Sequence, residues 1–218
     1  MKNYKSVEEE MGINRTIIRG ANENPEIVTG IEPFGYSAEK RQEGLNLLSA
    51  AEQSIQTQKL EYSEQYVASN AFQEAKGLVE KDFLRFKRIA KHVFSENAEG
   101  WKLLRLGEHN PRTYESWYSY VDGLYTVLLS HEALLTAMAR FGCTAENVTA
   151  DQNSLRDLNN MKQNLFTETG EAQRATKDRD QKMEALKQYT NDLVFVLKLA
   201  FEGDDAQLLE KLGIIVYS

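Results

Sequence analysis

Residues 79–93 read VEKDFLRFKRIAKHV, and this stretch decides the fold class because its apolar side chains recur at helical spacing. Steps of four and three residues alternate along it, and the apolar positions are Val79, Phe83, Phe86, Ala90 and Val93. This spacing is the a/d pattern of a helix that packs against another helix. The stretch therefore predicts a long helix in contact with a second one.

Proline is rare in this chain of 218 residues, and its three copies are Pro25, Pro33 and Pro111. Because proline disrupts helix interiors, the two long proline-free stretches, 34–110 and 112–218, favour helices over a loop-rich β fold. Three- and four-residue apolar steps also recur on both sides of residues 79–93. We therefore predict an all-α fold, an elongated antiparallel bundle of long amphipathic helices with two short helices.

Two long segments, 38–94 and 151–201, leave an alternative open. Each is either one unbroken helix or a helical hairpin, since Ser69-Asn70 and the polar stretch 167–182 fit a turn as well as a solvated helix. An unbroken helix over 38–94 would be about 85 Å long. We expect so long a helix to need a second chain, which would make the protein self-associate.

Turn and capping residues predict where the other helices begin and end. A short helix is expected over 101–106, and Thr113 should cap a helix that runs to about Phe141 and stops at Gly142. Thr149 and Gln152 have the form of a capping box for the next helix. Gly203-Asp204 should end one helix and precede a last short one over 206–212.

The first 36 residues differ from the rest, since they hold two of the prolines and four glycines and show no clear helical period. We predict an extended N-terminal arm over 1–36, with a short strand at Ile27-Val28 or a brief helix over 7–11, followed by a helical bundle domain over 37–218. Ser37 is expected to cap the first bundle helix.

A weak internal repeat connects two parts of the chain about 107 residues apart. Residues 88–94 and 103–107 resemble residues 196–201 and 208–213, each pair joining a helix to a short helix and a glycine. The similarity indicates either two equivalent halves joined by the helix over 113–141, or a coincidence between two amphipathic helices.

The C-terminal 50 residues carry a resemblance to a known family. Residues 170–176, GEAQRAT, then Arg179-Asp180 and residues 207–214, QLLEKLGI, resemble the end of a family of uncharacterised bacterial all-helical proteins. Tyr189 departs from the family pattern, which has a tryptophan there. The resemblance implies an all-helical fold and brings no activity or site residue with it.

Charge and composition exclude several classes of function. A net charge of −7 and a pI near 5.2 disfavour sequence-independent binding of nucleic acid, so we expect no nucleic-acid partner. One cysteine, Cys143, excludes an intrachain disulfide and any multi-cysteine metal site. No run approaches the ~20 apolar residues of a membrane span, and the start lacks the apolar region of a secretory signal, so a cytoplasmic protein is expected.

The sequence lacks the residues that the known metal and catalytic sites of helical bundles require. None of the three histidines has a glutamate three residues before it, which a ferritin-like di-metal site needs. His131-Glu132 begins like a zinc-protease helix, but Leu135 occupies the second histidine position. Ser37 and Lys40 have Ser-x-x-Lys spacing, for which a helix cap is the better interpretation. We predict no catalytic residue, no metal site and no cofactor, although an enzyme is not excluded.

An aromatic cluster between residues 101 and 125 is the first candidate binding site. Tryptophan, tyrosine and arginine are enriched at binding hot spots. The alternative interpretation is that these rings close one end of the bundle with their polar tips in solvent. The ligand-binding candidates are Trp101, His109, Arg112, Tyr114, Trp117 and Tyr118.

A basic helix surface is the second candidate. Helical spacing places several cations on or beside one face, where they could bind an anion or an acidic membrane surface. The alternative is a solvated face that forms salt bridges with an acidic neighbour. The anion-binding candidates are Lys81, Arg85, Arg88, Lys91 and His92.

Taken together, the sequence favours a non-enzymatic interaction or structural protein that acts through its helix faces and its N-terminal arm. The expected partner is another protein or a second copy of the chain. The alternatives are a small-ligand-binding bundle that uses the aromatic cluster and an anion or membrane-surface binder that uses residues 81–92.

Overall fold

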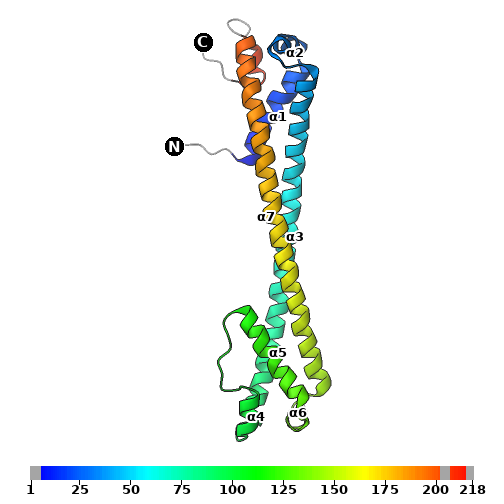
Figure 1. Cartoon of the computed structure of the whole chain (residues 1–218), viewed down its shortest axis with the longest axis vertical. Coiled ribbons are helices and arrows are strands. Elements are labelled where there is room, and N and C mark those ends of the chain that lie inside the picture. Colours follow the sequence, from blue (N-terminus) through cyan, green and yellow to red (C-terminus); the bar gives the residue numbers. More distant parts are fainter. Residues whose placement is uncertain (1–5, 202–206, 215–218) are drawn as a thin grey trace. The chain divides into compact units, whose positions relative to one another are not determined.

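The structure is a computed structural model that describes residues 6–201 and 207–214 (Figure 1). No strand is found among these residues, which confirms the all-α prediction. The helices are α1 (Val7–Glu23), α2 (Pro25–Ile31), the 3-10 helix η1 (Glu32–Phe34), α3 (Ala38–Val93), α4 (Ala98–Leu103), α5 (Tyr114–Ser130), α6 (Glu132–Ala139), α7 (Ala145–Ala200) and α8 (Gln207–Glu210).

The two long segments are unbroken helices, which decides the alternative that the sequence left open. Ser69 and Asn70 lie inside α3, and the polar stretch 167–182 lies inside α7. The capping box expected at Thr149 is wrong because α7 already begins at Ala145. Thr144 takes the capping role, since its hydroxyl accepts a hydrogen bond from the Asn147 backbone N–H at 3.3 Å.

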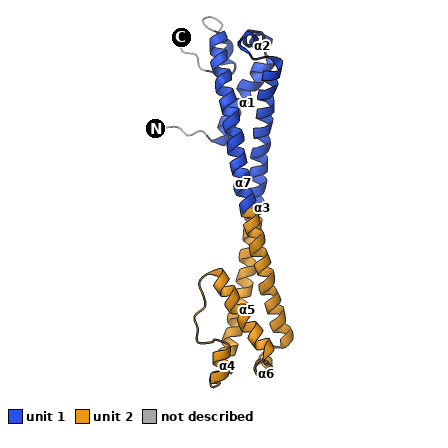
Figure 2. Cartoon of the chain, in the orientation of Figure 1, with its two compact units in different colours: residues 1–63, 170–218 blue, residues 64–169 orange. Residues whose placement is uncertain are grey.

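The chain divides into two compact units, and α3 and α7 contribute to both (Figure 2). Unit 1 comprises residues 1–63 and 170–218, and unit 2 comprises residues 64–169. The division therefore falls inside the segment 37–218, for which the sequence predicts one bundle domain.

Residues 7–34 are helical, so the prediction of an extended N-terminal arm is wrong, and so is the strand at Ile27-Val28. A capping box starts α1, since Ser6 accepts from the Glu9 backbone N–H and donates its own N–H to the Glu9 carboxylate. Asn24 caps α2, whose first residue is Pro25. Proline at this position favours a helix, because its fixed φ suits the first turn and its missing N–H is not needed there.

Unit 1 is built on the antiparallel pairing of α3 with α7, and α1 packs against them (Figure 1). Tyr189 on α7 donates a hydrogen bond to the Lys40 carbonyl at 2.8 Å, and Thr176 Oγ1 lies 3.3 Å from Tyr62 Oη. From the first pair to the second, the residue number increases on α3 and decreases on α7. The two helices are therefore antiparallel. Burial raises the pKa of Tyr189, so its hydroxyl stays a neutral donor.

Unit 2 encloses the second core, which α3, α5, α6 and α7 share with the segment around α4. Four of the five apolar residues in the 79–93 pattern are buried, and Val93 is partly buried against the same core. Phe86 packs edge-on against Tyr125 of α5 with their ring centroids 5.1 Å apart. The helix-packing prediction from this stretch is confirmed.

The helix expected over 113–141 is two helices. Thr113 caps α5 as predicted, with its hydroxyl accepting from the Ser116 N–H, and Gly142 has the left-handed φ of 86° expected after a helix end. His131 interrupts the helix because its backbone is extended and its ring Nδ1 lies 2.8 Å from the Val127 carbonyl oxygen. Both α5 and α6 pack inside unit 2, so this segment does not join two halves.

The remaining boundary predictions fall near the observed ones. Helix α4 overlaps the short helix expected over 101–106, and α8 lies within the one expected over 206–212. Ser37 caps α3, since its hydroxyl accepts from the Lys40 N–H at 3.3 Å. The predicted break at Gly203-Asp204 lies outside the described residues.

Candidate functional site

A groove of about 990 Å³ lies between α1 and α3. It lies entirely within unit 1. Met11 on α1 and Ile55 on α3 are buried side chains that form its apolar lining. The other eight lining residues are polar or charged, so the groove is more polar than the mostly apolar pockets that bind small ligands.

Ion pairs between the two helices form the charged part of the groove. Glu52 on α3 lies 2.8 Å from Arg15 and 3.9 Å from Arg19, both on α1. Lys59 on α3 lies 3.4 Å from Glu8 on α1. The three cations of the lining therefore face two carboxylates, and both arginine side chains keep about half of their surface in solvent.

The pKa of Glu8 is lowered, first by a hydrogen bond to its own backbone N–H in the first turn of α1 and then by Lys59. Its carboxylate is therefore charged at neutral pH and stays paired with Lys59. The free donors of the groove are those of Arg15 and Arg19 that point to solvent. The electrostatic surplus of the groove is positive.

The sequence prediction missed this groove because it expected at most a brief helix over 7–11, whereas α1 continues to Glu23. The missed signal was the Ser6-Glu9 capping box, followed by buried positions at Met11, Ile18 and Ala21 on one side of a helix. Met11, Arg15 and Arg19 share the adjoining stripe at steps of four residues.

Three of the aromatic candidates gather on the unit 2 core. Tyr114 lies with its ring centroid 6.0 Å from that of Trp117 and 6.3 Å from that of Tyr118. Trp117 is buried and packs edge-on against Phe83 at 6.4 Å. Burial raises the pKa of Tyr114 to about 12. These contacts are those of a bundle core with one polar edge.

The other three candidates lie apart from that group. Trp101 on α4 faces Lys91, whose Nζ is 6.0 Å from the ring centroid. His109 and Arg112 are exposed in the segment between α4 and α5. Among the described residues, no hydrogen bond or ring contact joins these three to Tyr114, Trp117 or Tyr118.

A lysine of the chain itself lies over the Tyr114 ring and over two further aromatic rings. The Nζ of Lys162 on α7 lies 5.4 Å from the ring centroid of Phe72, 5.2 Å from that of Tyr114 and 4.8 Å from that of Phe166. Aromatic faces attract a cation at this distance. Tyr114, one of the six candidates, is thus already in contact with a cation of unit 2 itself.

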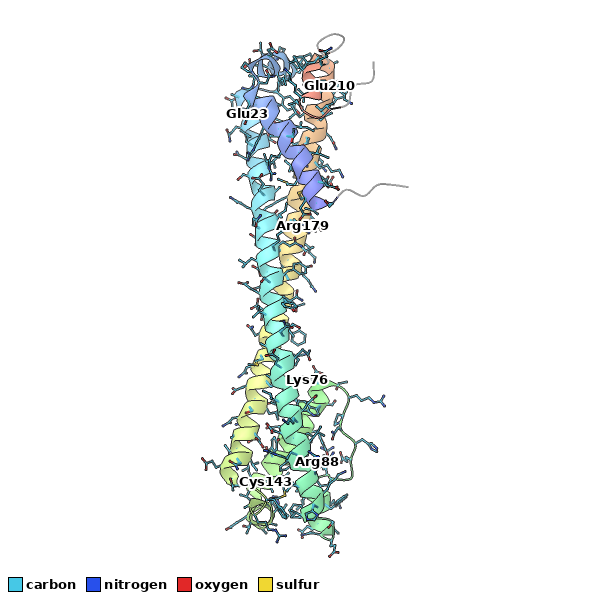
Figure 3. The ribbon with its side chains drawn as sticks, turned by 180° about the vertical axis from the view of Figure 1, so that it is seen from behind. Glu23, Lys76, Arg88, Cys143, Arg179 and Glu210 are labelled. Carbon is cyan, nitrogen blue, oxygen red and sulfur yellow. The ribbon has the colours of Figure 1, made fainter. Side chains whose placement is uncertain are left out.

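The five basic candidates are all exposed on the C-terminal part of α3. Arg85 lies 3.7 Å from Asp82, one turn earlier on the same helix. The ring of His92 packs edge-on against Phe141 at 5.7 Å. Figure 3 labels Arg88 on this part of α3.

Lys87, which lies among these cations, has a different role that its sequence position did not reveal. It is 7% exposed, and its ammonium donates to the Glu108 carbonyl (3.0 Å), Asn110 Oδ1 (2.7 Å) and Tyr120 Oη (2.8 Å). An ammonium has three donors, so all are used. Burial, and next the nearby Lys91, lower the pKa of Lys87. Lys87 thus holds the segment after α4 against α3.

The only cysteine is poorly placed for chemistry. Cys143 is buried after α6, and burial raises the pKa of its thiol (Figure 3). Since the thiolate is the reactive form, this environment suppresses nucleophilic and redox reactions.

The fold and the groove define a class, the all-α helical-bundle proteins that carry a surface groove between two helices. We compared the chain with protein-family models, curated proteins and solved structures, and none of them matches it. The family resemblance of the last 50 residues therefore stays a prediction. Within the described residues, no helix has an apolar window long enough to cross a bilayer.

Proposed function

We propose that this chain is a non-enzymatic interaction protein that binds a partner protein in the groove between α1 and α3. One observation carries the proposal, namely a groove of about 990 Å³ that combines a buried apolar lining with three cations and two carboxylates. It develops the sequence-based expectation of a protein that acts through helix faces and its N-terminal segment.

The lining favours an amphipathic helix with an acidic edge as the bound segment. Apolar side chains of such a helix can contact Met11 and Ile55, as in other complexes where a helix lies in a groove. Its carboxylates can bind the solvent-facing donors of Arg15 and Arg19, which point outward beside Glu52. Charge complementarity of this kind sets the orientation and raises the association rate, and like charges at the same places oppose binding.

A binding assay with designed peptides tests this proposal. The probe is a labelled amphipathic peptide of about 16 residues with leucines on one face and glutamates along its edges, and its matched partner carries lysines instead. Fluorescence anisotropy should show that the acidic peptide binds at least about tenfold more tightly. Equal affinity for the two peptides, or none for either, would contradict the proposal.

Charge reversal locates the interaction. Arg19→Glu should weaken binding of the acidic peptide by about tenfold, since it replaces a solvent-facing donor with a carboxylate. The control is Arg174→Glu, an equal charge change at an exposed position of α7 in the same unit. Circular dichroism verifies that both variants are folded. If both variants lost the same affinity for the acidic peptide, the peptide would be binding through the overall charge of the chain and not through the groove.

A second copy of the chain is the other partner that the sequence suggested. Sedimentation of the wild type and of Arg19→Glu distinguishes self-association from binding to a foreign partner, because a dimer that forms through the groove would dissociate in the variant.

We further propose a cytoplasmic location, which the single buried thiol supports. The antiparallel α3 and α7 with their 4-3 apolar spacing also support a coiled-coil classification.

A further inference from the structure

The outer face of the last turns of α3 is a cationic surface in unit 2, distant in sequence from the groove and not used by it. Helical spacing places this face opposite the buried residues Phe83, Phe86 and Ala90. We define the basic surface as the exposed residues Lys81, Leu84, Arg85, Arg88, Lys91 and His92.

Its cations are largely uncompensated. Among the described residues, no carboxylate lies within ion-pair distance of Lys81, Arg88 or Lys91, and Arg85 has only Asp82 at 3.7 Å. The segment 81–112 contains eight lysines and arginines against four aspartates and glutamates, in a chain whose net charge is −7. Because salt screens charges beyond about 8–10 Å, this local surplus acts independently of the acidic remainder.

Exposed apolar side chains accompany the cations. Leu84 is 48% exposed and lies one helical turn from Lys81 and from Arg88. Phe141, after α6, is 38% exposed, and its ring contacts His92 at 5.7 Å while the Arg140 guanidinium lies 4.7 Å from its centroid. The surface therefore offers charge and apolar area side by side.

We propose that the basic surface binds the anionic headgroups of a membrane surface. Clusters of four or more lysines and arginines are attracted to acidic lipids, and exposed apolar side chains strengthen such binding by entering the interface. An acidic protein would use the cations but has no need of Leu84 and Phe141 in solvent. A nucleic acid would likewise use the cations and would leave Leu84 and Phe141 in solvent.

Vesicle flotation with the full chain tests the proposal. The probes are phosphatidylcholine vesicles with and without about 30% phosphatidylserine. The chain should float with the acidic vesicles only, and raising the salt from about 0.05 to about 0.3 M should release it. Equal recovery with both kinds of vesicle, or none with either, overturns the proposal.

Three variants assign the binding to this surface. Arg85→Gln with Arg88→Gln should lower the partition coefficient at least about tenfold, while the charge-matched control Arg156→Gln with Arg174→Gln should change it little. Leu84→Ser keeps the charge and should lower vesicle binding severalfold. Vesicle binding unchanged in Leu84→Ser would assign the surface to soluble polyanions and overturn the lipid proposal. Circular dichroism confirms that each variant is folded.

Discussion

Lys87→Met is expected to loosen unit 2 at the segment between α4 and α5. The substitution keeps the apolar stem and removes an ammonium that donates to Glu108, Asn110 and Tyr120. Two of these acceptors are on exposed residues and gain water, whereas the Tyr120 hydroxyl is buried and loses its donor. Relief of the buried charge offsets part of the loss.

The magnitude follows from those contacts. A buried acceptor left without its donor costs about 1–3 kcal/mol, and the cation–π contact between Lys87 and the Tyr120 ring, at 4.8 Å, adds about 0.5–1 kcal/mol. After the offset we expect a net loss of about 2 kcal/mol in the free energy of unfolding. Lys91→Met is the matched control, an exposed lysine one turn later, and should change it by less than about 0.5 kcal/mol.

Urea unfolding followed by tryptophan fluorescence measures the global effect. Limited trypsin digestion measures the local one, because Arg105 and Arg112 lie in the segment that Lys87 holds. Both sites should be cut faster in Lys87→Met than in Lys91→Met. If the two variants had the same stability and the same cleavage rates, the structural role assigned to Lys87 would be refuted.

Three further predictions concern groups that the structure leaves in unusual environments. Asn14→Leu should raise the free energy of unfolding by about 1 kcal/mol, because Asn14 is 5% exposed and its Nδ2 has no hydrogen-bond partner. Urea unfolding measures this change, and a lower free energy of unfolding in the variant would contradict the prediction. Tyr114→Phe should leave stability at pH 7 nearly unchanged and flatten its decline above pH 10. The pKa of Tyr114 is raised from its ordinary 10.0 to about 12, so the Tyr114 hydroxyl loses its proton at lower pH in the unfolded chain than in the folded one. The free energy of unfolding therefore falls as the pH rises from about 10 to about 12. Melting temperatures measured over this pH range would contradict the prediction if they declined equally in the wild type and in Tyr114→Phe. Cys143 should react with iodoacetamide at least about tenfold more slowly in the folded chain than in urea, as mass spectrometry can follow, and equal rates would show that the thiol is accessible.

Local signals in the sequence were sufficient to predict helices and helix ends that depend only on apolar periodicity and capping residues. The 4-3 spacing over 79–93 identified a helix whose apolar side packs in the core, and Thr113 and Gly142 marked a helix start and a helix end. These features depend on residues within one or two turns, so no tertiary knowledge is needed to find them.

The N-terminal prediction failed because glycines and prolines were interpreted as breaks. Pro25 begins α2, where its lack of an N–H costs nothing, and Gly20 and Gly30 lie within helices at close approaches to Leu212 and Phe201. Close packing, not chain flexibility, explains these two glycines, and it cannot be seen without the fold.

The candidate sites depended still more on tertiary contacts. Lys87 differs from Lys91 only because a segment about 20 residues later folds back onto it. Trp101 and Trp117 are near in sequence, yet one lies beside Lys91 and the other in the core. The groove requires α1 to lie on α3, through pairs such as Arg15 and Glu52 that are 37 residues apart.

Hydrogen–deuterium exchange of the full chain, with and without the acidic amphipathic peptide, tests the central claim most directly. The account predicts slower exchange in α1 and in the part of α3 around residues 52–59, where Met11, Arg15 and Ile55 line the groove, and no such change with the lysine-edged peptide. Unchanged exchange in both segments at a saturating concentration of the acidic peptide, or protection confined to other helices, would contradict it.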